Sequence, residues 1–136
     1  MKLLKKCFFV LILSCSVIAL NSCILAAVAV GGGTVAYLNG NYSMNIQGNY
    51  KDVYIASLKA VKENNDFVLV SKTIDSKNNN ADIEGATKID STSFSVEIKK
   101  LTKYASKVTI KFSAFGNQQM SSTLMDKIQA KLYQKS

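Results

Sequence analysis

Three stretches in the second half of the chain alternate between apolar and polar residues, and this alternation constrains the fold more than any other feature. It runs through residues 81–86, 94–99 and 107–112, with short polar turns between the stretches. Successive side chains of a strand point to opposite faces of a sheet, so a period of two predicts strands with one apolar and one solvated face. Strands this short and evenly spaced favour an antiparallel meander.

Two further strands and a helix are predicted before the meander. Residues 42–47 alternate in the same way. Residues 67–74 are rich in β-branched residues, and the start of this run is apolar enough to predict a strand buried on both faces. Between these two strands, apolar residues recur at helical spacing from Tyr50 to Val61, directly after Asn49, which is a good N-cap.

A second amphipathic helix is predicted near the C-terminus, with Asn117 as its N-cap. Its apolar residues are spaced four apart and are Met120, Leu124, Ile128 and Leu132. The predicted order of elements is therefore β-α-β-β-β-β-α. We expect a two-layer α+β fold, in which an antiparallel sheet of four to five strands is covered on one face by two helices.

The N-terminus has the pattern of a bacterial lipoprotein signal. Three lysines precede an apolar run over residues 7–20, and Ser22 and Cys23 follow that run. A basic start, an apolar core and a small residue at the cleavage site are typical of a secretory signal, which is absent from the mature protein. A cysteine directly after the small residue is typical of the form in which that cysteine is diacylated. We therefore predict a signal peptide over residues 1–22 and a lipidated N-terminus at Cys23.

The sequence leaves two other interpretations of this segment open. Cys15 also follows a small residue, Ser14, but leaves a shorter apolar core before it. The apolar segment is also long enough for an uncleaved membrane-spanning helix, which needs about 20 residues. The three successive glycines at positions 31–33 disfavour such a helix.

We divide the mature chain into a lipid-anchored tether rich in Gly and Ala, residues 23–38, and a single globular domain, residues 39–136. In the alternative interpretation, residues 34–38 are the first strand of the domain. Without the signal no cysteine other than Cys23 remains, so we expect no disulfide, redox or metal-thiolate site. All basic residues are Lys, and removing the three in the signal leaves 14 lysines against nine acidic residues.

Five lysines lie on the last two predicted strands and the turn between them. They are Lys99, Lys100, Lys103, Lys107 and Lys111. We identify them as a candidate surface for anionic head groups, near which each Lys contributes about 1 kcal/mol. The alternative is an ordinary solvated sheet face whose charges oppose aggregation. Nucleic acid is not expected as a partner, because the cluster lacks stacking aromatic residues and the signal exports the chain.

Large, flexible apolar residues from both helices and from the strands are candidates to line a cavity between the two layers. The candidate set is Met44, Tyr54, Leu58, Phe112, Leu124 and Ile128. Such a cavity would hold an apolar small molecule. The alternative is a filled core.

We predict no catalytic residue, no metal site and no cofactor, and we expect that the protein is not an enzyme. The chain has no His, and no nucleophile, base and orienting group stand out by their spacing. Residues 75–80 are rich in oxygen ligands, but Asn80 and Ala86 stand where a calcium loop needs Gly and Glu. Asp82 and Glu84 share a strand face, which we interpret as solvated.

Four segments resemble a known family. They are Leu20-Asn21-Ser22-Cys23, the Gly-rich run into Thr34-Val35-Ala36-Tyr37, the helix Val53-Tyr54-Ile55-Ala56-Ser57-Leu58-Lys59-Ala60, and Phe115-Gly116. They are similar to small Gram-negative lipoproteins of unknown function, above all to Francisella-type members with masses near the 14.8 kDa of this chain. The resemblance covers nearly the whole mature chain. It implies an α+β lipoprotein domain, a link to virulence for one member, and no known reaction.

These features together predict a protein attached to the outer membrane by lipid (palmitate) on Cys23. The residue after the cysteine is Ile24 rather than Asp, so the inner-membrane retention signal is missing. The domain would lie in the periplasm or at the cell surface. We expect a non-enzymatic binding or structural module with an envelope protein as partner, and the alternative is a carrier of an apolar ligand.

Overall fold

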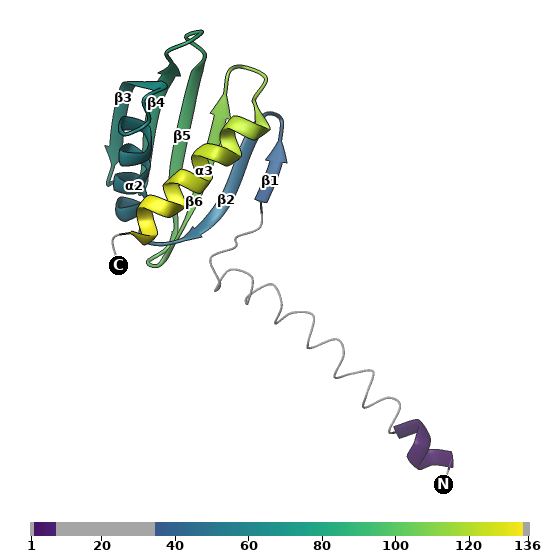
Figure 1. Ribbon diagram of the computed structural model, residues 1–136. Helices are drawn as coiled ribbons and strands as arrows, with labels where there is room; N and C mark the ends of the chain where they lie inside the picture. Colours follow the sequence, from purple (N-terminus) through teal and green to yellow (C-terminus); the bar gives the residue numbers. More distant parts are fainter. Residues whose placement is uncertain (1, 8–34, 135–136) are drawn as a thin grey trace.

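The computed structural model describes residues 2–7, which are helical, and residues 35–134. The second range folds into a six-stranded antiparallel sheet with two helices on one face (Figure 1), which confirms the predicted α+β fold. The predicted cleavage site, Cys23 and most of the predicted tether lie outside the described residues. Among the described residues, no helix combines the length and the apolar character that crossing a bilayer requires.

The order across the sheet is β1-β2-β6-β5-β4-β3. Strands β4 to β6 form the predicted meander and β3 extends it, whereas helix α2 carries the chain from β2 to β3 at the far edge. The strands are β1 (Val35–Leu38), β2 (Asn41–Gln47), β3 (Phe67–Asp75), β4 (Asn80–Thr87), β5 (Ser93–Thr102) and β6 (Ala105–Phe112). The two main helices are α2 (Tyr50–Lys62) and α3 (Gln118–Tyr133).

The sheet has one strand more than predicted, because the end of the predicted tether forms β1. Tyr37 of β1 lies opposite Tyr42 of β2. Asn39 and Gly40 connect the two strands with φ values of 54° and 82°, and Asn-Gly is a strong signal for a two-residue hairpin turn. The structure therefore agrees with the interpretation of this segment as a first strand for residues 35–38.

The β1–β2 turn packs against the chain that leads into α3. A Cβ atom added to Gly116 would lie 2.3 Å from the Cα atom of Gly40, and both glycines have positive φ. The two backbones can approach each other this closely because neither residue has a side chain. The contact fixes the start of α3 relative to the β1–β2 hairpin.

The core lies between the sheet and the two helices. Alternate residues of β2, β4, β5 and β6 face the helices and are buried. Three rings meet in this core: Phe94 lies 4.7 Å from Phe67 and 4.8 Å from Phe112 between ring centroids. The apolar face of each strand that the alternation predicts thus lies against the helices, as expected.

The prediction that the strand at residues 67–74 is buried on both faces is wrong. This strand, β3, is an edge strand, and Val68 and Val70 are 47% and 64% exposed. Phe67 and Leu69 pack against the core from one face, while no described element covers the other face. A β-bulge between Leu69 and Ser71 also interrupts the strand, and bulges of this kind make an edge less suitable for pairing with another chain.

Both helices begin where predicted. The side chain of Asn49 accepts a hydrogen bond from the Lys51 backbone N–H (2.9 Å), and that of Asn117 accepts one from the Met120 backbone N–H (3.0 Å). Helix α2 buries mostly small residues and Val side chains, so Tyr54 and Leu58 lie at the flank of its buried face and are only partly buried.

Candidate functional site

The five candidate lysines do not share one surface. Lys99, Lys107 and Lys111 alternate with buried residues of β5 and β6. They therefore point to the face of the sheet that is turned away from the helices, which we call the outer face. Lys100 lies opposite the buried Ser106. Lys103 lies in the β5–β6 turn, whereas Lys111 lies near the opposite end of β6.

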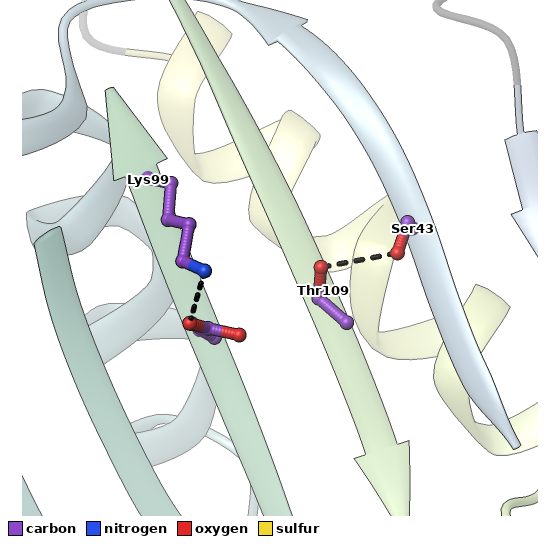
Figure 2. Close-up of polar contacts among 4 residues, drawn as sticks. Ser43, Lys99 and Thr109 are labelled. Carbon is purple, nitrogen blue, oxygen red and sulfur yellow. Dashed lines mark hydrogen bonds and ion pairs between the residues drawn. The ribbon is translucent and has the colours of Figure 1, made fainter. Parts of the chain in front are cut away.

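The centre of the outer face carries both signs of charge. The Lys99 ammonium lies 3.1 Å from the Glu97 carboxylate, and Glu97 lies directly opposite Asp82 of β4. The hydroxyl groups of Ser43 and Thr109 form a 3.0 Å hydrogen bond between β2 and β6. Figure 2 shows Lys99, Ser43 and Thr109 on this face, with the helices behind the strands. This part of the outer face is a mixed polar surface rather than a cationic one.

Two carboxyl groups at this sheet have pKa values shifted in opposite directions. Partial burial raises the pKa of Asp82, and the nearby negative charges of Glu97 and Glu84 raise it further. Hydrogen bonds from the side chain and backbone of Asn78 hold the pKa of Asp75 below its usual value. The ionised form is therefore disfavoured at Asp82 and favoured at Asp75.

We expect Asp82→Asn and Asp75→Asn to change thermal stability with opposite signs. A raised folded-state pKa means that ionised Asp82 destabilises the fold above that pKa, and this effect disappears as the pH falls below the ordinary value of 3.8. Asp82→Asn should therefore raise Tm slightly at pH 7 and not at pH 3. Asp75 stabilises the fold above its ordinary pKa and loses this effect as the pH falls through its lowered pKa, so Asp75→Asn should lower Tm at pH 7.

Thermal unfolding followed by circular dichroism at both pH values measures these shifts. The two variants serve as controls for each other, because each replaces one Asp by Asn in the same sheet. A lower Tm for Asp82→Asn at pH 7 would contradict the assigned effect of Glu97 and Glu84.

The tip of the β5–β6 hairpin is fixed by hydrogen bonds to the connection between β2 and α2. The Gly48 N–H donates to the Tyr104 carbonyl (2.7 Å), and the Ser106 hydroxyl donates to the Gly48 carbonyl (2.8 Å). Leu101 and Tyr104 are nevertheless 47% and 69% exposed. The Lys103 ammonium lies 5.7 Å from the centre of the Tyr104 ring. The backbone of the β5–β6 turn is thus held in place, and the turn presents the side chains of Leu101 and Tyr104 together with the cationic side chain of Lys103.

The six residues proposed to line a cavity all belong to the core cluster or pack against it. Met44, Phe112, Leu124 and Ile128 are buried, and Tyr54 and Leu58 are partly buried against the same cluster. One member of the set, Leu124, also borders a surface groove of about 370 Å³.

This groove lies between α3, the start of β3 and the turn from β4 to β5. Its apolar side chains are Phe67, Ile89, Met120 and Leu124. Its volume falls in the range of small-molecule sites, about 300–1,000 Å³. The sequence contains one signal for this groove, since Ile89 is an isolated apolar residue in a polar turn. In the structure Ile89 is 92% exposed.

In the oxygen-rich turn at residues 75–80, the Asp75 carboxylate is hydrogen-bonded to groups of the same turn. Asp75 accepts hydrogen bonds from the backbone N–H groups of Lys77 and Asn78 and from the Asn78 side-chain amide. Within the two described ranges, no group of three or more His, Cys, Asp or Glu side chains is arranged to hold a metal ion.

The sequence from residue 6 to residue 131 matches a protein family described as "Protein of unknown function (DUF3568)". The match covers nearly the whole chain and confirms the predicted membership of a family of unknown function. No curated protein matches the sequence.

Proposed function

We propose that this chain, which belongs to the DUF3568 family of unknown function, is an outer-membrane lipoprotein attached by lipid on Cys23. In this proposal the globular domain is a non-enzymatic binding or structural module, located in the periplasm or at the cell surface, with an envelope protein as its partner. The resemblance to a virulence-linked lipoprotein extends the proposal to a role in virulence.

The observation that carries the proposal is a lipoprotein-type signal followed at short distance by a folded domain. Val35, the first residue of β1, follows Cys23 by 12 positions. An extended chain spans at most about 3.3–3.6 Å per residue, so the start of β1 lies within about 43 Å of Cys23. A lipid on Cys23 would therefore hold the sheet close to the bilayer surface.

The outer face of the sheet supports a binding role for the domain. Both helices pack on the other face, so the outer face presents polar side chains of β2, β4, β5 and β6 in cross-strand rows. One row runs from Ser43 through Thr109 and Glu97 to Asp82. A rigid face of this kind can meet the surface of a second protein without refolding.

We expect that Cys23→Ala abolishes lipidation and releases the protein from the membrane. The thiol of this residue is the proposed site of acylation, and without it no lipid anchor forms. Incorporation of labelled palmitate and fractionation after an alkaline wash measure the two effects. Cys15→Ala is the matched control and should leave both unchanged. A Cys23→Ala variant that still incorporates palmitate and stays in the membrane would contradict the lipoprotein assignment, and one that stays there unlabelled would favour the uncleaved anchor.

A carrier of an apolar ligand is the second candidate function, and the groove beside α3 favours it. Phe67, Met120 and Leu124 provide an apolar floor that is continuous with the core, and Ile89 provides an exposed apolar rim. In this proposal the ligand lies in the groove rather than between the two layers.

We expect a carrier to retain an apolar ligand through purification and to be stabilised when a fatty acid is added. Native mass spectrometry would then show a lipid-sized adduct, which Met120→Lys should remove because it places a charge in the groove. Ile55→Lys is the control, because Ile55 is an exposed residue of α2 outside the groove. A protein without adduct whose Tm does not respond to any fatty acid would exclude the carrier function.

A further inference from the structure

We propose that the domain docks on an anionic membrane surface through the end of the sheet formed by the β5–β6 hairpin, which we call the hairpin end. Leu101 and Tyr104 would enter the interface, and the surrounding lysines would contact lipid phosphates. This inference rests on the proposed lipid anchor, and it adds which part of the domain faces the bilayer.

Lysines gather at this end from three connections that are adjacent in space. Besides the β5–β6 hairpin, these are the β3–β4 turn, where the Asn79 carbonyl accepts from the Lys100 N–H (3.0 Å), and the start of α2, which follows Gly48. The lysines are Lys51, Lys77, Lys99, Lys100, Lys103 and Lys107. The acidic residues nearby are Asp52, Asp75, Asp82 and Glu97. The excess of positive charge is what an anionic surface attracts.

Two of these lysines face each other within the sheet. Lys99 of β5 lies directly opposite Lys107 of β6, and like charges in this arrangement destabilise a strand pair. Glu97 forms an ion pair with Lys99 and relieves only part of the repulsion. Lipid phosphates beside Lys99 and Lys107 would offset the repulsion between the two ammonium groups.

The apolar side chains at the tip fit the interfacial region of a bilayer. Tyr is enriched where one end of a side chain contacts lipid and the other contacts water, and Tyr104 in the turn is 69% exposed. Hydrogen bonds to Gly48 hold the backbone of the turn. Docking therefore requires no ordering of this segment.

The direction of β1 agrees with docking through the hairpin end. Strands β1 and β6 both pair antiparallel with β2, so they run in the same direction, as their arrows show in Figure 1. Strand β6 leaves the hairpin, so β1 also runs away from the hairpin end, and its first residue, Val35, lies opposite Met44 in the middle of β2. The opposite end also exposes apolar residues, Ile89 and Phe115, but β1 runs toward that end and away from the hairpin.

Spin labels on the full-length, lipidated protein reconstituted into vesicles test this orientation. Tyr104→Cys is compared with Phe115→Cys, which replaces another exposed aromatic residue at the opposite end. The native cysteines are at positions 7, 15 and 23, so after cleavage and acylation the introduced thiol is the only free one. Collision rates with oxygen and with a water-soluble nickel chelate report burial of each label in the bilayer.

In phosphatidylglycerol vesicles the label at position 104 should show an oxygen-to-nickel collision ratio at least about threefold higher than in phosphatidylcholine vesicles, because the lysines favour anionic lipid. The label at position 115 should remain in water in both. Raising the salt concentration should reduce the difference. A label at position 104 that stays in water in both lipids, or a label at position 115 that is buried instead, would overturn the docking proposal.

Lysine substitutions test the docking surface separately from the lipid anchor on Cys23. The double variant Lys103→Gln/Lys107→Gln should bring the position-104 label back toward its value in phosphatidylcholine, while Lys111→Gln, at the far end of β6, should have no effect. The mass of the N-terminal peptide of the same samples shows whether Cys23 carries lipid. A lipidated protein with a water-exposed position 104 refutes only the docking surface, whereas a protein without lipid refutes the proposed function.

Discussion

Phe112→Ala should destabilise the domain by about 3–5 kcal/mol, the range for truncating a fully buried aromatic residue. Phe112 is 0% exposed, and its ring lies 4.8 Å from that of Phe94 and 5.8 Å from that of Phe67. Truncation removes both ring contacts and leaves a void in the middle of a packed cluster. Urea denaturation measures the change in the free energy of unfolding.

Leu58→Ala is the matched control for this prediction. Leu58 packs against the same cluster but is only partly buried, so its truncation should cost less than half as much. If the layers instead enclosed a ligand cavity at Phe112, the substitution would enlarge an existing void and its effect would be small. A loss below about 1 kcal/mol for Phe112→Ala would therefore contradict a filled core.

Gly116→Ala should also be strongly destabilising, although it adds only one methyl group. The residue has a φ of +83°, where a side chain costs about 1–2 kcal/mol. Its Cβ atom would lie 2.3 Å from the Cα atom and 2.4 Å from the carbonyl oxygen of Gly40. These are backbone atoms, so the β1–β2 turn must move away from α3, and we expect a total loss above about 2 kcal/mol.

Asn39→Ala is the control that measures the cost of a positive φ alone, without the contact between the two glycines. Asn39 has a φ of 54° in the same turn, so Ala there meets the unfavourable φ region, and the loss should stay near 1 kcal/mol. Equal losses for Gly116→Ala and Asn39→Ala would show that the contact between the two glycines does not matter.

The alternation of apolar and polar residues predicted β2, β4, β5 and β6 correctly because each has one face on the core and one in solvent. Strand β3 was harder, since an apolar run does not reveal whether a strand lies at the centre or the edge of a sheet. That depends on the order of strands, which here follows from β6 pairing with β2. Strand β1 is short, and only its Asn-Gly turn identifies it.

The lysine cluster was predicted only in part, for a geometric reason. Lys107 and Lys111 are four residues apart on one strand, which separates them by about 13 Å at about 3.3 Å per residue. Side-chain alternation sends Lys99 and Lys100 to opposite faces. Lysines that are near in the sequence therefore need not share one surface. Lys77 is distant in the sequence, and only the fold shows that the β3–β4 turn brings it to the hairpin end.

The groove beside α3 was not predicted because its walls come from distant segments. Met120 lies on α3, whereas Phe67 and Ile89 lie at the beginning of β3 and in the turn after β4. The i+4 ridge of α3 predicted which helix residues are apolar. It could not show that Met120 borders a surface groove together with Phe67 and Ile89.

The most direct test of the central claim is the intact mass of the protein purified from native membranes. We expect a chain that begins at Cys23 and carries a diacylglycerol group on the thiol of that residue. A mass that includes residues 1–22, or a chain that begins elsewhere and carries no lipid, would contradict it.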